Sequence, residues 1–129
     1  MILDTTAIID LLRGDKSILK RVESLEKINA PVSTTSISIF ELWQGTIDMK
    51  DDKKRNKICT LLESIGSLQF DVQSAKEAGL IYSNLRKSGN IIDPEDCMIA
   101  GIVKINKETL LTRNKKYFSR IDQLKVEYY

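Results

Sequence analysis

Short apolar segments alternate with longer amphipathic segments along almost the whole chain. A short apolar run suits a buried strand, whereas apolar residues three or four positions apart mark one face of a helix. These patterns predict strands at residues 1–3, 31–34, 68–70, 109–111 and 124–126, and helices at 7–12, 16–28, 37–43, 54–65, 72–87 and 94–105. Strands separated by helices predict an α/β fold with a central, mainly parallel sheet flanked by helices on both faces.

The length of the chain and its apolar pattern indicate how many domains it has and where in the cell it is expected. A chain of 129 residues fits one domain, spanning 1–129. No apolar run approaches the roughly 20 residues of a membrane span, and the first residues lack the basic and apolar regions of a signal peptide. We therefore expect a cytoplasmic protein without a membrane anchor. Cys59 and Cys97 form neither a CxxC pair nor a zinc-finger spacing, so we expect two buried, reduced thiols.

The sequence contains no histidine. This absence excludes Ser-His-Asp and Cys-His catalysis, zinc held by histidine, and acid–base chemistry by an imidazole. An enzyme built from this chain must use carboxylates, hydroxyls, lysines or a metal ion bound by oxygen atoms. The net charge of +2 permits binding to nucleic acid without arguing for it.

Acidic and polar residues occur at or near the predicted strand–helix junctions. Asp4 follows the first strand, Glu41 lies in the helix after the second, Asp93 to Asp96 open the sixth helix, and Thr112 to Asn114 follow the strand at 109–111. In parallel sheets, ligands bind outside the carboxyl ends of the strands, near the point where the strand order reverses. Each of these junctions is therefore a candidate for the functional site.

Helix capping is the alternative explanation for each acid. Asp4 and Asp93 are suitable N-caps, the latter before Pro94, and Ser38 with Glu41 matches the Ser-x-x-Glu capping box. Taken singly, each acid is better explained as a cap. Taken together, they favour a site, because a lone acid in an apolar helix such as Glu41 needs a partner if it is buried. A metal ion shared by Asp4, Glu41 and Asp96 would supply one.

A cluster of carboxylates suits Mg²⁺ or Mn²⁺ rather than zinc or copper. Such an ion can activate water and stabilise charge on a phosphodiester without any histidine. Basic residues follow the last of these junctions, namely Arg113, Lys115, Lys116 and Arg120. They could contact phosphate or form a solvated face, and the pattern leaves both interpretations open.

Three segments, in order, resemble the PIN-domain family and, within it, the VapC toxins of VapBC toxin–antitoxin systems. The first is Met1 to Thr6, and the second is Ser38 to Gly45, with an acid and a glycine four residues apart. The third runs from Gly89 to Phe118 and contains Ile92-Asp93-Pro94-Glu95-Asp96 and Leu111-Thr112-Arg113-Asn114. Each motif alone is weak, whereas the ordered set covers nearly the whole chain and is fairly specific.

The resemblance implies a three-layer PIN-like sandwich and an Mg²⁺- or Mn²⁺-dependent endoribonuclease that forms a homodimer and is inhibited by a VapB-type antitoxin. Asp4, Glu41 and Asp96 match the three core acids of the family and would bind the metal. The family often carries a fourth acid where this chain has Asn114, whose amide oxygen could still hold a metal ion or its water. Thr112, Arg113 and Lys115 are candidates for contact with substrate phosphate. Thr112 could also hydrogen-bond an acid.

A second interpretation comes from a different functional class. A PIN-like module without catalytic activity, binding only RNA or a protein partner, would carry the same fold. Metal-dependent cleavage of RNA by the purified chain distinguishes the two. Phosphatases of the haloacid dehalogenase type are disfavoured, because Thr6 stands where their second aspartate is needed.

Overall fold

The computed structural model describes all 129 residues and contains one sheet of five strands. The strands are β1 (Ile2–Leu3), β2 (Ser33–Thr35), β3 (Gly66–Leu68), β4 (Leu110–Thr112) and β5 (Val126–Tyr128), and their order across the sheet is β3-β2-β1-β4-β5. Every neighbouring pair is parallel. The predicted α/β class with a mainly parallel sheet is confirmed, and the sheet has no antiparallel strand.

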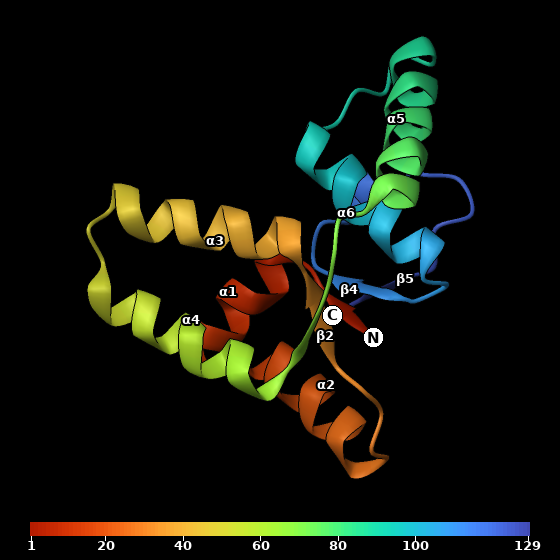
Figure 1. The fold of residues 1–129 in the computed structure, drawn as a ribbon. Helices are drawn as coiled ribbons and strands as arrows, with labels where there is room; N and C mark the ends of the chain where they lie inside the picture. Colours follow the sequence, from red (N-terminus) through yellow and green to blue (C-terminus); the bar gives the residue numbers. More distant parts are fainter.

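Seven helices connect the strands: α1 (Thr5–Arg13), α2 (Lys16–Lys27), α3 (Ser36–Asp48), α4 (Asp52–Ser64), α5 (Val72–Lys87), α6 (Pro94–Ile105) and α7 (Lys115–Phe118). Figure 1 shows α5 and α6 on one side of the sheet and α1 to α4 on the other, with α3 and α4 forming a hairpin that extends away from the strands. None of these helices is long and apolar enough to cross a membrane.

The side chains of the two central strands account for this layering. Successive residues of a strand point to opposite faces, so Ile2 and Leu110 face the α5–α6 layer while Leu3 and Leu111 face the α1–α4 layer. All four are at most 1% exposed. Each face therefore has its own apolar core, as a three-layer sandwich requires.

The strand order also locates the crevice. From β1 the chain moves outward to β2 and β3, and then returns to β4 on the other side of β1. The order reverses between β1 and β4, so ligands are expected outside the carboxyl ends of these two strands. Leu3 and Thr112 are the last residues of these strands, and Asp4 follows directly.

Several predicted boundaries are wrong. Helix α1 begins at Thr5 instead of Ala7, and α3 continues through Gly45, where it was expected to end. A glycine within a helix costs only about 1 kcal/mol, and the next residue, Thr46, is fully buried, so packing keeps α3 helical. Helix α7 was not predicted. Cys59 is exposed instead of buried, because α4 turns Ile58 to the core; both cysteines are free.

Candidate active site

Asp4 connects the first strand to the first helix and is 3% exposed. Its Oδ1 atom accepts a hydrogen bond of 2.7 Å from the amide of Ala7, so the predicted N-cap role is confirmed. Its Oδ2 atom accepts a bond of 2.5 Å from the hydroxyl of Thr112, at the end of β4. The Thr6 hydroxyl lies 2.9 Å from both carboxylate oxygens. Asp4 thus accepts more hydrogen bonds than an N-cap requires. They come from α1, which follows β1, and from the end of β4, the two strands between which the strand order reverses.

Glu41 lies in the second turn of α3, and its carboxylate accepts a hydrogen bond from the hydroxyl of Thr5. The predicted capping box of Ser38 and Glu41 is wrong. The N-cap of α3 is Thr35, whose hydroxyl oxygen accepts a bond of 3.0 Å from the amide of Ser38. The helix begins one turn earlier than the capping box requires, because Thr35 ends β2 and caps α3 at once. Glu41 therefore has no capping role in α3.

Asp96 lies in the first turn of α6, where the helix dipole favours an acid. Asp93 occupies the N-cap position and Pro94 the first helical position, as predicted, although the Asp93 side chain makes no capping hydrogen bond. Asp96 accepts no hydrogen bond from another side chain or from the backbone in this structure, and it is only partly buried. Its carboxylate is therefore the least satisfied of the three.

Burial and repulsion from nearby acids raise the pKa of three acids, Asp4, Glu41 and Asp96, which we call the acid group; the charge that acts on Asp4 is that of Asp10. Loss of solvent is the main cause for each one. The pKa of Asp96 rises to about 7, because burial is followed by repulsion from Glu41 and Asp4. Hydrogen bonds from Thr112 to Asp4 and from Thr5 to Glu41 oppose the rise at those two acids. The acids therefore share one electrostatic neighbourhood, although they lie 92 residues apart at the extremes of the sequence (Asp4 and Asp96).

The donor set of the acid group fits a hard divalent cation. None of the ion pairs in the structure includes Asp4, Glu41 or Asp96, so their negative charge has no cationic partner in the chain. Carboxylate oxygens are the ligands that Mg²⁺ and Mn²⁺ prefer. The three carboxylates do not converge tightly enough in this structure to hold an ion together. Asp4 and Glu41 are each hydrogen-bonded to a threonine hydroxyl instead.

The raised pKa of Asp96 predicts how the stability of the metal-free protein depends on pH. Between the usual value of 3.8 and about 7, folded Asp96 keeps a proton that the unfolded chain releases. The free energy of unfolding should therefore fall as pH rises through this window. Asp96→Asn should remove this decline and gain about 2 kcal/mol above pH 7, less than the full shift implies because Asp96 retains solvent contact.

The measurement is denaturant unfolding in a chelating buffer, with wild type and variant compared near pH 3.8 and above pH 7. The two proteins should agree at the acidic end and separate at the alkaline end. Equal stabilities of wild type and variant at both pH values would show that burial and neighbouring acids do not penalise the Asp96 carboxylate.

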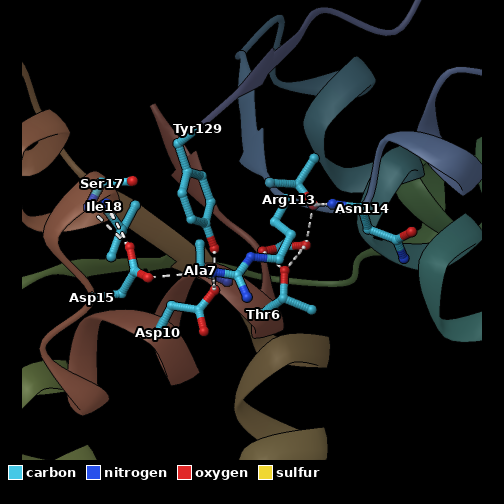
Figure 2. A network of polar contacts seen from close by, with 11 residues as sticks. Thr6, Ala7, Asp10, Asp15, Ser17, Ile18, Arg113, Asn114 and Tyr129 are labelled. Atoms are coloured by element: carbon cyan, nitrogen blue, oxygen red, sulfur yellow. Dashed lines mark hydrogen bonds and ion pairs between the residues drawn. The ribbon is translucent and has the colours of Figure 1, made fainter.

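The segment after β4 carries the other predicted site residues. The Thr112 hydroxyl donates to Asp4 and accepts a bond of 2.9 Å from the amide of Asn114, so the predicted hydrogen bond between Thr112 and an acid is confirmed. The Asn114 side chain makes no capping bond to α7 and points away from Arg113 in Figure 2. Lys115 is exposed, with its Nζ atom 5.8 Å from the centre of the Tyr128 ring. Contacts of Thr112 and Lys115 with substrate phosphate stay predictions.

Arg113 lies in a second polar cluster that the sequence did not indicate (Figure 2). Its guanidinium is 3.0 Å from Asp10 and 3.4 Å from Asp15, and it stacks near the ring of Tyr129, whose hydroxyl donates to Asp10 at 2.8 Å. Burial and the bond to Asp10 raise the pKa of Tyr129. Arg113 is therefore already paired with two carboxylates, so it is less available for contact with a substrate phosphate. The sequence feature that could have indicated this cluster is Asp10, an acid within the otherwise apolar predicted helix at 7–12.

Comparison with known proteins shows which family and which solved structures this chain is similar to. A model of the PIN domain family matches residues 1–124, which include the whole acid group. The chain is 34% identical over 101 residues to ribonuclease VapC3 of Methanocaldococcus jannaschii, covering 78% of this chain and 95% of that protein. It is 31% identical over 130 residues to ribonuclease VapC of Rickettsia bellii, covering 98% and 93%. A chain in the crystal structure of VapBC2 from Rickettsia felis, bound to a DNA fragment from the promoter, superposes with a TM-score of 0.91 at 26% identity, covering 99% and 97%.

Proposed function

Because this chain belongs to the PIN domain family, we propose that it is a metal-dependent endoribonuclease and the toxin of a VapBC-type toxin–antitoxin pair. The observation that carries the proposal is the acid group: three acids without a cationic partner, beside the carboxyl ends of β1 and β4. Buried carboxylates are usually paired with a cation, and a metal ion bound by these three acids would supply that missing positive charge.

The cofactor in this proposal is Mg²⁺ or Mn²⁺, held by Asp4, Glu41 and Asp96. A bound ion of this kind supplies polarised water and positive charge for hydrolysis of a phosphodiester. The chain does the positioning. Thr112 and Thr6 orient Asp4, and Thr5 orients Glu41. Asp96, with a pKa of about 7, releases its proton to become a ligand, so ion binding should weaken in acid.

The test of this function is cleavage of RNA by the purified chain. We expect cleavage with Mg²⁺ or Mn²⁺ and none in excess chelator. Cleavage that persists in chelator would remove the acid group from the mechanism. Binding of RNA without cleavage under every metal condition would favour the module without catalytic activity.

The partners in this proposal are an RNA substrate, a VapB-type antitoxin and a second copy of the chain. Solved relatives such as VapBC2 of Rickettsia felis are complexes of both components. Expression of this chain alone should slow growth, and co-expression with its antitoxin should restore it. Light scattering of the purified chain should give the mass of a homodimer. Normal growth with soluble protein present would contradict the toxin role.

Asn114 occupies the position of the frequent fourth acid, and its side chain is not used in capping. If that position contributes to the metal site, Asn114→Asp adds a charged ligand and should tighten Mn²⁺ binding by about tenfold, measured by calorimetry. Asn84→Asp, on the exposed face of α5, adds the same charge elsewhere and should leave the affinity unchanged. Equal tightening in both variants would mean that only net charge matters.

A further inference from the structure

A groove with an excess of positive charge lies between α1 and the beginning of α4, away from the acid group. Its volume is about 390 Å³. We call it the α1–α4 groove, and its lining residues are Ile9, Leu12, Arg13, Met49, Asp51, Lys53, Lys54 and Lys57. Four of these side chains are cationic and three are apolar. The groove lining thus combines apolar and cationic side chains.

Neighbouring acids offset only part of the positive charge of this groove: Asp51 lies in its lining, and Glu23 and Glu26 line an adjoining pocket with Lys53 and Lys57. Asp51 is used as the N-cap of α4, where its carboxylate accepts a bond of 2.9 Å from the amide of Lys54. Asp52, the next acid, pairs with Arg55 at 3.0 Å. None of the ion pairs in the structure includes Arg13, Lys53, Lys54 or Lys57. The local excess of charge is therefore available to an anionic ligand.

A nuclease with the acid group at its active site needs a cationic surface elsewhere to bind RNA. Its three carboxylates repel the phosphates of an RNA strand, and the whole chain carries a net charge of only +2. Binding therefore depends on where the cations are concentrated. Helix α1 links the two places directly. Asp4 caps its N-terminus, and Ile9, Leu12 and Arg13 line the groove at its other end. A helix of this length spans only about 13 Å.

We propose that the α1–α4 groove binds the phosphate backbone of the RNA strand whose cleavage takes place at the acid group. This inference rests on the proposed endoribonuclease function and adds to it a binding surface. RNA is favoured over an acidic protein segment for two reasons. A lining of four cationic and three apolar side chains suits a continuous polyanion with apolar sugar and base surfaces. The groove is also within one helix length of Asp4, the acid of the group that caps α1.

The experiment measures binding of a labelled single-stranded RNA of about 16 nucleotides by fluorescence anisotropy. Excess chelator prevents cleavage, and the salt concentration is varied. The variant is the double substitution Lys53→Gln/Lys57→Gln. Its matched control is Lys76→Gln/Lys87→Gln, which removes two exposed, unpaired lysines from α5 on the other side of the sheet. Circular dichroism confirms that both variants are folded.

The groove variant should bind RNA about tenfold more weakly, and its salt dependence should be shallower by about 1.4, since each lost phosphate contact removes about 0.7 from the slope for a single strand. The control should bind like wild type. Equal losses in the two variants, or no loss in either, would overturn the groove proposal. So would wild-type RNA binding combined with weaker binding of the antitoxin, because the groove would then belong to the protein partner.

The results that would contradict the proposed nuclease function differ from those that would contradict the groove proposal. If wild type never cleaves RNA with Mg²⁺ or Mn²⁺ but the groove variant still loses RNA binding, the chain is an RNA-binding module and the groove assignment holds. If wild type cleaves RNA and the groove variant binds like the control, the nuclease function holds and the groove assignment is wrong.

Discussion

Asp4→Asn is expected to lower metal-dependent RNA cleavage by about a hundredfold or more and to leave the protein as stable as wild type at neutral pH. The two effects separate because Asp4 has two functions in the structure. An asparagine oxygen can still accept the 2.7 Å bond from the amide of Ala7, and asparagine caps helices as well as aspartate does. Asparagine loses the negative charge and, with only one accepting oxygen, also the 2.5 Å bond from Thr112. The cost of that lost bond is offset because burial no longer penalises a charge at this position.

The matched control is Asp71→Asn, at the N-cap of α5. Asp71 accepts a bond of 2.8 Å from the amide of Ser74 in the same geometry, but it is exposed and is not among the charges that raise the pKa values of the acid group. This variant should keep full cleavage. A large loss of stability in Asp4→Asn, with cleavage per folded molecule unchanged, would mean that Asp4 serves only as a cap.

The location of the acid group could be predicted from sequence because it depends on local patterns. Asp4 and Asp96 stand next to recognisable strand and helix boundaries, and Glu41 is conspicuous in an apolar helix. The contacts of these acids could not be predicted in the same way. Thr112 binds Asp4 across 108 residues of sequence, and Arg113 pairs with Asp10 across 103. Such pairs exist only because β1 and β4 are neighbours in the sheet, and strand order is a long-range property.

The fold shows the same division between local and long-range causes. The number of strands and the six longer helices follow from apolar periodicity. Helix α7 has four residues, too few to show a period, and it forms where Phe118 becomes buried. Strand β5 lies two residues later than predicted, at Val126–Tyr128, because pairing with β4 determines its register. These short elements depend on tertiary packing more than on their own residues.

Gly101→Ala is expected to destabilise the protein by about 3 kcal/mol, because α5 and α6 pack in unusually close contact at this residue. A Cβ atom at position 101 would lie 2.6 Å from the carbonyl oxygen of Ser74 and 2.9 Å from the amide nitrogen of Ala78. Both are backbone atoms of α5, so no side chain can rotate to make room. The helices must separate, and thermal unfolding should occur about 10 °C lower.

Gly79→Ala provides the matched control, because it makes the same substitution within a helix of the same pair. A Cβ atom there meets nothing within 4 Å, so the gain in helix propensity should stabilise the protein by about 0.5 to 1 kcal/mol. The Gly101 variant should also lose cleavage at temperatures where it remains folded. Asp96 lies in the first turn of α6, and a displaced α6 carries it away from Asp4 and Glu41. Wild-type cleavage in a destabilised but folded Gly101→Ala protein would show that the acid group tolerates movement of α6, contrary to the close electrostatic coupling of its three carboxylates.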